Sequence, residues 1–576
     1  MRRCAGFAVA LALMLAFTAC DKGNTQTGDN SLIVSNPMNL NYRFQFDEPG
    51  YREAADPVCE LFKDKYYLFA SKSGGYWSST DLAHWQFIPC STIEEIEGYA
   101  PSILVRNDSI YYIGSGTGIY VTANPEEDNW TKIDSKFNLG VTDPAFFQDE
   151  DGKVYLYWGC SDKDPIEGVE VDPLNGFAPI GQRVTLIEHH IDLYGWEVQG
   201  EHNELGTVGW NEGPCMTKHR GKYYLQYASP GTQFRSYADG VYVSDNPLGP
   251  YTYVEDNPYS YKPGGFIGGA GHGHTFQDRY GNYWHIATMK ISVRHMFERR
   301  LGLFPLHIDH EGNFVQHTTW SDYPFEIPQR KADFSEDILP KGWAMLSFDK
   351  PTLASSYILG YLPSYAADEQ VETWWSAETG NPGEWLELDL KAVQTVNAIQ
   401  VNFADQDFTI RAPRPYEVYY QYKIEASADR EHWVNIVDRS ANTADMPHEL
   451  VVLDTPTEAR YIKITNTKEL PGKFSISGLR VFGKATGALT YEAKDVQVER
   501  GEDGRKISLS WQRDKYANGY IIRVGVKKDQ LNKSIMVHDN IYTGRSFNRD
   551  SDYYFRIDTF NENGITEGTQ LYEAKR

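Results

Sequence analysis

The stretch that decides the fold is residues 143–159, DPAFFQDEDGKVYLYWG. It opens with an acidic residue and a proline, continues as a short apolar run, turns through polar residues and ends as a Tyr-rich strand. Polar turns between two apolar runs are typical of β-hairpins. The same pattern recurs in 56–71 (DPVCELFKDKYYLFAS), 100–115 (APSILVRNDSIYYIGS), 212–228 (EGPCMTKHRGKYYLQYA) and, more weakly, 271–287 (GHGHTFQDRYGNYWHIA).

The spacing of these five copies predicts a β-propeller. Equivalent positions are 44, 43, 70 and 59 residues apart, at Pro57, Pro101, Pro144, Pro214 and Gly273. Units of this length that open with a hairpin fit blades of four strands, and five copies indicate five blades. A β-solenoid or a sandwich is the alternative, and the unequal spacing argues against a solenoid. No stretch has sustained helical periodicity, so we expect an all-β protein.

Composition and charge limit the classes of partner that the protein is expected to bind. The 576 residues are 41% hydrophobic and 23% charged, which excludes bulk disorder. The net charge of −24 disfavours a nucleic-acid partner and an acidic polysaccharide. Aromatic residues make up 14% of the chain, which suits stacking on sugar rings, although β-sheet packing explains any single aromatic equally simply.

The N-terminus is typical of an export signal. Arg2 and Arg3 precede an apolar stretch of 13 residues, 5–17, which is too short to span a bilayer. Small residues then precede Cys20, as in a bacterial lipoprotein cleavage site. We therefore expect a signal peptide at 1–19, lipidation at Cys20, a polar tether over 20–35, and attachment to a membrane, periplasmic or at the cell surface, through the lipid alone. An ordinary signal peptide with an incidental cysteine is the alternative.

The other cysteines predict no metal or redox site. Cys59, Cys90, Cys160 and Cys215 form no CxxC pair, so a zinc site is disfavoured. We expect small buried residues, although export permits a disulfide.

The first residues of the five repeats predict a functional site. Innermost strands of a propeller begin around one axis, and the repeats open at Asp56, Ala100, Asp143, Glu212 and His272. Like charges held together cost stability, so three carboxylates at equivalent positions indicate a site rather than packing.

With these motifs, residues 36–330 resemble glycoside hydrolase family 43. The segments SSTDLAHW (78–85) and GVYVSDNPLGPY (240–251) resemble the family's blade endings. The resemblance implies an inverting glycoside hydrolase with Asp56 as general base and Glu212 as general acid. Asp143 would raise the pKa of Glu212 and orient it. The implied reaction is exo-acting release of arabinofuranose or xylose from plant polysaccharide. Release of galactofuranose or galactose, and a non-catalytic glycan-binding lipoprotein, are the alternatives.

The resemblance also suggests ligands around these carboxylates. His272, with His274 as a competitor, would hold a Ca²⁺ ion, and no organic cofactor is expected. Stacking on sugar is expected from Trp77, Tyr99 and Trp210. Arg300, or its neighbour Arg299, would bind substrate hydroxyls, and packing is the competing explanation for each of these side chains.

Two further β domains follow the propeller. Residues 345–484, with WLELDL (385–390) and ARYIKIT (459–465), resemble a discoidin-like F5/8 type C jelly roll that binds carbohydrate. Residues 487–576, with ISLSW (507–511), resemble a fibronectin type III sandwich acting as a spacer. Because all three carboxylates precede residue 330, we expect the propeller to perform the chemistry independently of these domains.

Overall fold

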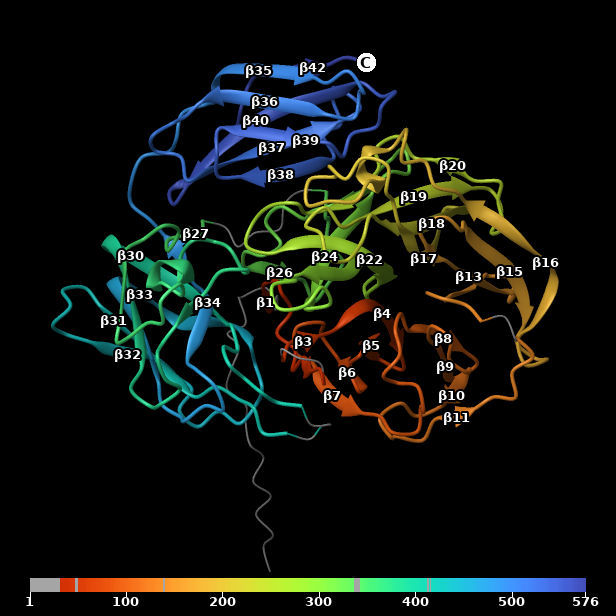
Figure 1. Ribbon diagram of the computed structural model, residues 1–576, viewed down its shortest axis with the longest axis horizontal. Coiled ribbons are helices and arrows are strands. Elements are labelled where there is room, and N and C mark those ends of the chain that lie inside the picture. Colours follow the sequence, from red (N-terminus) through yellow and green to blue (C-terminus); the bar gives the residue numbers. More distant parts are fainter. Residues whose placement is uncertain (1–31, 47–49, 138–139, 336–341, 412–413, 415) are drawn as a thin grey trace, which may run out of the picture.

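The computed structural model describes residues 32–46, 50–137, 140–335, 342–411, 414 and 416–576. The signal peptide predicted at 1–19 and the lipidation site at Cys20 lie outside this part of the chain. Five antiparallel sheets surround a common centre, and two further β domains lie beside them (Figure 1). The described residues contain two short 3₁₀ turns, η1 (Gly195–Glu197) and η2 (Pro363–Ala366), and otherwise strands and loops. The prediction of an all-β fold that opens with a five-bladed propeller is therefore confirmed.

Each blade is built on a four-stranded sheet that follows one repeat. Blade one has β4 (Ala55–Phe62), β5 (Lys65–Ser71), β6 (Gly75–Ser79) and β7 (Gln86–Pro89); blade two has β8 (Ser102–Arg106), β9 (Ser109–Ile113), β10 (Tyr120–Thr122) and β11 (Thr131–Lys132); blade three has β12 (Ala145–Gln148), β13 (Val154–Trp158), β15 (Ile166–Asp172) and β16 (Ala178–Ile187); blade four has β17 (Asn211–His219), β18 (Lys222–Ser229), β19 (Ala238–Ser244) and β20 (Thr252–Tyr253), with β14 (Cys160–Ser161) and β21 (Ser260–Tyr261) paired beside it; blade five has β22 (Gly268–Gln277), β23 (Tyr283–Lys290), β24 (Arg299–Ile308) and β25 (Phe314–Gln316).

The blade hairpins follow from the turn residues. The two-residue turns 63–64, 107–108 and 220–221 have positive φ at both positions, which is the backbone that a tight antiparallel hairpin requires. The second strands are rich in Tyr and other large apolar residues, and all five residues of β13 are buried. Their side chains pack between neighbouring blades, so the aromatic content of the repeats is used largely as blade-to-blade core.

The N-terminal end of the described chain is part of the propeller. Strand β1 (Leu32–Val34) pairs antiparallel with β26 (Phe325–Ile327), and β2 (Arg43–Phe44) pairs with β3 (Arg52–Glu53). The prediction of a tether as far as residue 35 is therefore wrong for its last residues, because their apolar side chains supply a strand. Among the described residues, no helix has the length and apolar character needed to cross a membrane.

The second domain is a jelly roll built around two long strands. Strands β30 (Trp385–Phe403) and β33 (His448–Asn466) are each 19 residues long and carry bulges, so they bend and join both layers. Its core contains Trp375, which is fully buried. Its strands are β27 (Ala344–Met345), β28 (Thr352–Ala354), β29 (Trp375–Ser376), β30 (Trp385–Phe403), β31 (Tyr422–Ser427), β32 (Val434–Asp438), β33 (His448–Asn466) and β34 (Ser475–Lys484).

The C-terminal domain is a two-sheet sandwich that packs on the propeller (Figure 1). Gly195 donates its amide to the Phe547 carbonyl at 3.0 Å, and Lys533 lies 3.0 Å from Asp256. One apolar cluster joins its core to blades three and four, so the spacer interpretation is wrong. Its strands are β35 (Lys494–Arg500), β36 (Ile507–Gln512), β37 (Gly519–Gly525), β38 (Lys533–Val537), β39 (Ile541–Gly544), β40 (Tyr553–Asn561), β41 (Gly564–Thr566) and β42 (Tyr572–Ala574).

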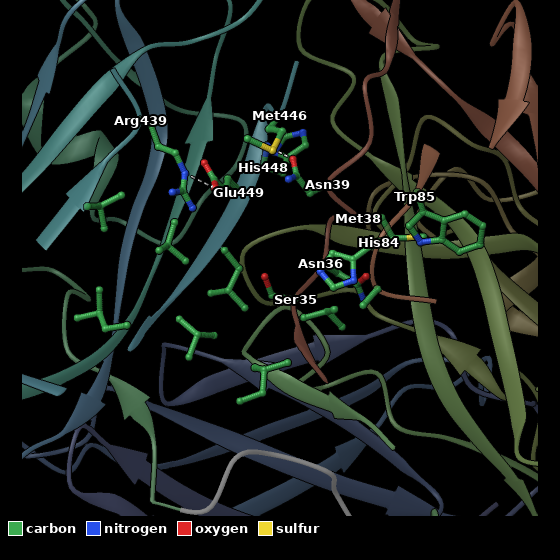
Figure 2. Close-up of a pocket in the computed structure, with 18 of the residues that line it drawn as sticks. Ser35, Asn36, Met38, Asn39, His84, Trp85, Arg439, Met446, His448 and Glu449 are labelled. Atoms are coloured by element: carbon green, nitrogen blue, oxygen red, sulfur yellow. Dashed lines mark hydrogen bonds and ion pairs between the residues drawn. The ribbon is translucent and has the colours of Figure 1, made fainter. Parts of the chain in front are cut away.

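A cavity of about 270 Å³ lies between blade one and the jelly roll. Figure 2 shows His84 and Trp85 on the propeller side, and Arg439 and Glu449 on the jelly-roll side. Arg439 Nε donates to Glu449 Oε1 at 2.7 Å. None of the predicted site residues lines this cavity.

Candidate active site

The predicted site residues meet where the inner strands begin. Asp56, Ala100, Asp143 and His272 have left-handed φ values of 51°, 48°, 52° and 45°, and Gly213, which follows Glu212, has 58°. Non-glycine residues in this region cost about 1–3 kcal/mol each and concentrate at functional sites. Asp56, Asp143 and His272 turn their side chains from the blade toward the centre, as does Glu212, which precedes Gly213. The repeat therefore imposes one local conformation at five places, and this conformation brings the acidic groups together.

The side chains enclose a cavity of about 400 Å³, which is within the usual range for small-ligand sites. All five blades contribute to its lining. Its polar and charged members include all three predicted carboxylates, together with an imidazole, a guanidinium and a thiol. The lining residues are Asp56, Tyr99, Ser115, Thr142, Asp143, Cys160, Gln199, Trp210, Glu212, Gly231, Thr232, Gln233, His272, Met296, Phe297 and Arg299.

Asp56 is a buried carboxylate with three stabilising neighbours. Ser71 donates its hydroxyl to Asp56 Oδ2 at 2.6 Å, and Arg299 Nη1 donates to Oδ1 at 3.3 Å. His272 Nδ1 lies 3.4 Å from the same oxygen. Burial would raise the pKa of Asp56, but Arg299, His272 and Ser71 outweigh burial and lower the pKa below its usual value. Asp56 is therefore ionised at neutral pH.

Asp143 and His272 have raised pKa values, in contrast to Asp56. Burial raises the pKa of Asp143 to about 7; the charge of His272 opposes this rise, and Glu212 and Asp56 add to it. Burial lowers the pKa of His272, but the surrounding carboxylates, Asp56 first, raise it above its usual value. His272 Nδ1 lies 3.7 Å from Asp143 Oδ2. The site thus holds protons on buried groups near neutral pH.

Glu212 is oriented by three donors. Trp210 Nε1 donates to Oε2 at 2.8 Å, the Cys160 thiol approaches the same oxygen at 3.3 Å, and Tyr237 donates its hydroxyl to Oε1. A side chain at Gly213 would place Cβ 2.6 Å from the His272 ring, so the glycine allows Glu212 and His272 to share the centre. Both oxygens of Glu212 therefore have fixed positions.

Two family models match the chain. Residues 51–314 match the model described as "Glycosyl hydrolases family 43", and residues 352–479 match that of the "F5/8 type C domain". Residues 51–314 are a family 43 domain. The jelly roll is accordingly an F5/8 type C domain, as the sequence predicted.

Curated relatives of the family 43 domain are carbohydrate enzymes by name. "Beta-D-galactofuranosidase xynD" of Aspergillus niger is 27% identical over 237 residues, which cover 34% of this chain and 63% of the relative. "Arabinoxylan arabinofuranohydrolase" of Paenibacillus polymyxa is 32% identical over 296 residues, or 41% and 44% of the two chains. "Beta-xylosidase" of Xylanibacter ruminicola is 24% identical over 252 residues, or 34% and 77%. The matches therefore span 63% and 44% of the first two relatives.

Two predicted substrate contacts lie outside the family 43 cavity. Trp77 is 1% exposed, donates to Asn41 and packs against Phe87, so its ring is core. Arg300 is buried on the far side of β24 and donates to His448. The sequence prediction chose the wrong arginine of the pair, because neighbouring strand residues face opposite sides.

The other predicted contacts do line the cavity, together with residues that the sequence analysis missed. The Tyr99 ring lies tilted against that of Phe297, with ring centroids 5.8 Å apart, and Trp210 donates to Glu212. Phe297 was missed because it lies in a loop outside the repeats. Cys160 was also missed, because a lone cysteine carries no spacing signal.

The serines and threonine at or near the ends of the second strands were a usable signal. Ser71, Ser115 and Thr288 each accept the amide of the residue that opens the next blade: Ala100, Asp143 and Asp56. Thr288 therefore links the last blade to the first. The small residues closing each repeat were visible in the sequence, and hydroxyl groups at that place explain how adjacent blade openings are held together.

The donors near His272 do not fit the calcium ion suggested by the resemblance. Atoms of Asp143, Glu212 and His272 lie within 4.8 Å of one another. Calcium prefers about six to eight oxygen ligands, whereas this set offers one nitrogen and two carboxyl groups.

Proposed function

We propose that this protein is an inverting glycoside hydrolase that releases arabinofuranose or xylose from the ends of plant-type polysaccharides. One observation carries the proposal: Asp56, Asp143 and Glu212 line a single cavity to which all five blades contribute. Carboxyl groups with different environments are what acid and base roles at one pH require.

Asp56 is the proposed general base. Its contacts with Arg299, His272 and Ser71 keep it ionised, so it can accept a proton from a water molecule. The water oxygen then bonds to the anomeric carbon from the side opposite the leaving group. The bond from that carbon to the glycosidic oxygen breaks, and the configuration of the sugar inverts.

Glu212 is the proposed general acid, and Asp143 is its partner. Glu212 donates its proton to the glycosidic oxygen as the bond breaks. Burial raises the pKa of the neighbouring Asp143 to about 7, so a carboxyl proton is held beside Glu212 near neutral pH. Trp210 and Cys160 hold one carboxyl oxygen of Glu212 in place, and Tyr237 holds the other.

The sugar is proposed from the names of the relatives. Two of them are named for arabinofuranose and xylose, which supports the main proposal. The Aspergillus niger relative is named a galactofuranosidase, so galactofuranose is the second candidate. A non-catalytic glycan-binding protein remains the third reading, and the full set of carboxylates in one cavity favours catalysis over it.

Product analysis of the full chain tests the reaction. We expect hydrolysis of the nitrophenyl α-L-arabinofuranoside or β-D-xyloside, and an NMR time course whose first product anomer is inverted, because water attacks directly. The nitrophenyl β-D-galactofuranoside distinguishes the second candidate. Retention of configuration would contradict direct attack and reassign Asp56 as a nucleophile. Binding of these glycans without any hydrolysis would favour the non-catalytic reading.

We also propose that the protein is a lipid-anchored exported protein, on the basis of residues 1–20 alone. Cys20→Ala should move the protein from the membrane fraction to the soluble exported fraction, because the acylated thiol is lost. Cys4→Ala is the matched control, since Cys4 lies within the predicted signal peptide. An unchanged membrane fraction for Cys20→Ala would contradict the anchor.

A further inference from the structure

The short strand β3 connects the active site with the F5/8 type C domain. Successive side chains of a strand face opposite sides, and Glu53 faces the site, where Arg299 Nη2 lies 2.5 Å from its carboxylate. Arg299 also donates to Asp56. Arg52 faces the other way and is 1% exposed. Strand β3 thus carries both Glu53, which contacts Arg299, and the buried charge of Arg52.

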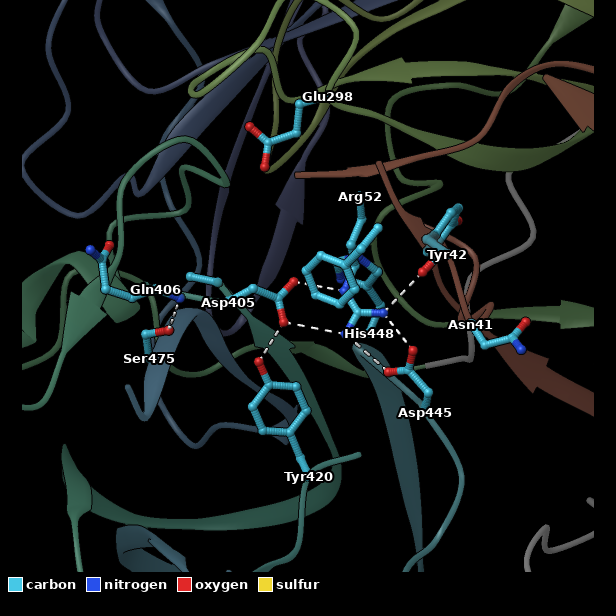
Figure 3. A network of polar contacts seen from close by, with 12 residues as sticks. Asn41, Tyr42, Arg52, Glu298, Asp405, Gln406, Tyr420, Asp445, His448 and Ser475 are labelled. Atoms are coloured by element: carbon cyan, nitrogen blue, oxygen red, sulfur yellow. Dashed lines mark hydrogen bonds and ion pairs between the residues drawn. The ribbon is translucent and has the colours of Figure 1, made fainter. Parts of the chain in front are cut away.

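Arg52 crosses the boundary between the two domains. Figure 3 shows its guanidinium between Asp405 and Asp445 of the F5/8 type C domain. Nε lies 2.7 Å from Asp405 Oδ2, and Nη1 lies 2.6 Å from Asp445 Oδ2. Nη2 donates to the second oxygen of each carboxylate, at 3.3 and 3.0 Å. Paired contacts of this kind fix the plane of the guanidinium as well as its position.

Arg300 makes a second crossing beside the first. Its Nε donates to His448 Nε2 at 2.9 Å, and its Nη1 donates to the carbonyls of Arg52 and Arg299 at 2.8 and 2.9 Å. His448 Nδ1 lies 2.9 Å from Asn402 Oδ1, which fixes Nε2 as the acceptor. Arg300 therefore ties the backbones of β3 and β24 together while a side chain of the F5/8 type C domain holds Arg300.

The interdomain cluster is defined as Arg52, Arg300, Asp405, Asp445 and His448. With His448 neutral, the two guanidinium groups of the interdomain cluster balance the charge of its two carboxylates. We propose that this cluster makes the F5/8 type C domain a positioning element of the active site, which holds β3 and β24 so that Arg299 meets the general base. The proposal rests on the proposed hydrolase function, and it replaces the expectation that the propeller works independently.

Arg299 is one of several groups that set the charge around Asp56. Ser71 donates a hydrogen bond, and Arg299 and His272 are the cations. If Arg299 moved away, its positive charge would no longer counteract the acidic neighbours of Asp56, and the pKa of Asp56 would rise. The charged and titratable groups facing Asp56 are Arg299 from β24, His272 from β22, Glu53 from β3, Asp143 at the start of blade three, Glu212 from β17 and Tyr237 from the loop before β19.

Asp405→Asn in the full chain tests the positioning role. The amide keeps the size of the side chain and leaves Asp445 to balance Arg52, so the protein should fold. We expect kcat on an aryl glycoside to fall about 10- to 100-fold, as for small displacements of catalytic groups, with little change in KM. The acidic limb of the kcat/KM profile should move to higher pH, because that limb reports the base.

Asp389→Asn is the matched control, since Asp389 pairs with Arg460 at 2.7 and 2.9 Å wholly within the F5/8 type C domain. It should change neither kcat nor the pH profile. His448→Gln, which retains an acceptor for Arg300, should exceed His448→Leu in kcat. A folded Asp405→Asn variant with wild-type kcat and an unmoved acidic limb would overturn the positioning role alone. An inactive wild-type protein would instead overturn the proposed function, and the positioning role with it.

Discussion

Asp56→Asn is expected to lower kcat by about 10³-fold on every glycoside that the protein hydrolyses, because a positioned general base contributes about 10²–10⁴-fold. The amide keeps the size of the side chain but cannot accept the proton of the attacking water. Because attack requires the base whatever leaves, an activated leaving group should not restore the rate. The measurement is kcat for a nitrophenyl glycoside and for a natural oligosaccharide.

The control for Asp56→Asn is Asp151→Asn, which changes an exposed carboxylate in a turn of blade three. It should leave kcat unchanged. Added azide supplies a small nucleophile that needs no base, so it should form a glycosyl azide with the Asp56→Asn variant. Wild-type turnover by a folded Asp56→Asn variant would rule out Asp56 as the base.

Glu212→Gln is the second large expected effect, and it should depend on the leaving group. The amide cannot protonate the glycosidic oxygen, so kcat on natural glycans should fall by about 10²–10⁴-fold. A dinitrophenyl glycoside should recover most of the rate, because its leaving group departs as an anion. Substrate binding should persist, since the glutamine can still accept hydrogen bonds from Trp210 and Tyr237.

Glu150→Gln provides the comparison for Glu212→Gln, because Glu150 is an exposed carboxylate of the same propeller. Its kcat should equal the wild-type value on both substrates. Equal losses for Glu212→Gln on natural and dinitrophenyl glycosides would show that Glu212 acts at another step. Undiminished hydrolysis of a natural glycan would remove Glu212 from the mechanism.

The propeller was predictable because its physics is local and repeated. Two-residue turns, Tyr-rich second strands and opening prolines are each visible in a window of about 16 residues, and five copies reinforce one another. The carboxylates were predictable for the same reason, since Asp56 and Asp143 occupy one repeated position and Glu212 lies one residue before it. Residues outside the repeat, such as Phe297 and Gln199, had no equivalent copies to identify them.

The errors have equally physical causes. Arg299 and Arg300 differ only in which face of β24 they occupy, and a shift of one residue reverses that face. Trp77 lies in a strand whose five residues are all buried, and an aromatic residue in sequence shows no exposure. No pattern in the sequence links Arg52 with Asp405 and Asp445, because the partners are more than 350 residues apart in the chain.

Because the F5/8 type C domain is docked on the propeller, any glycan that it binds lies at a fixed distance from the catalytic carboxylates. A glycan bound to a flexibly linked domain can reach the catalytic carboxylates at many chain lengths. A glycan bound to a rigidly docked domain reaches them only when it is long enough to span the fixed distance between the two sites. Any sugar that this domain binds therefore adds affinity only above a threshold length. A plot of kcat/KM against degree of polymerisation should rise in a step, and short chains should be hydrolysed as if the F5/8 type C domain carried no binding site.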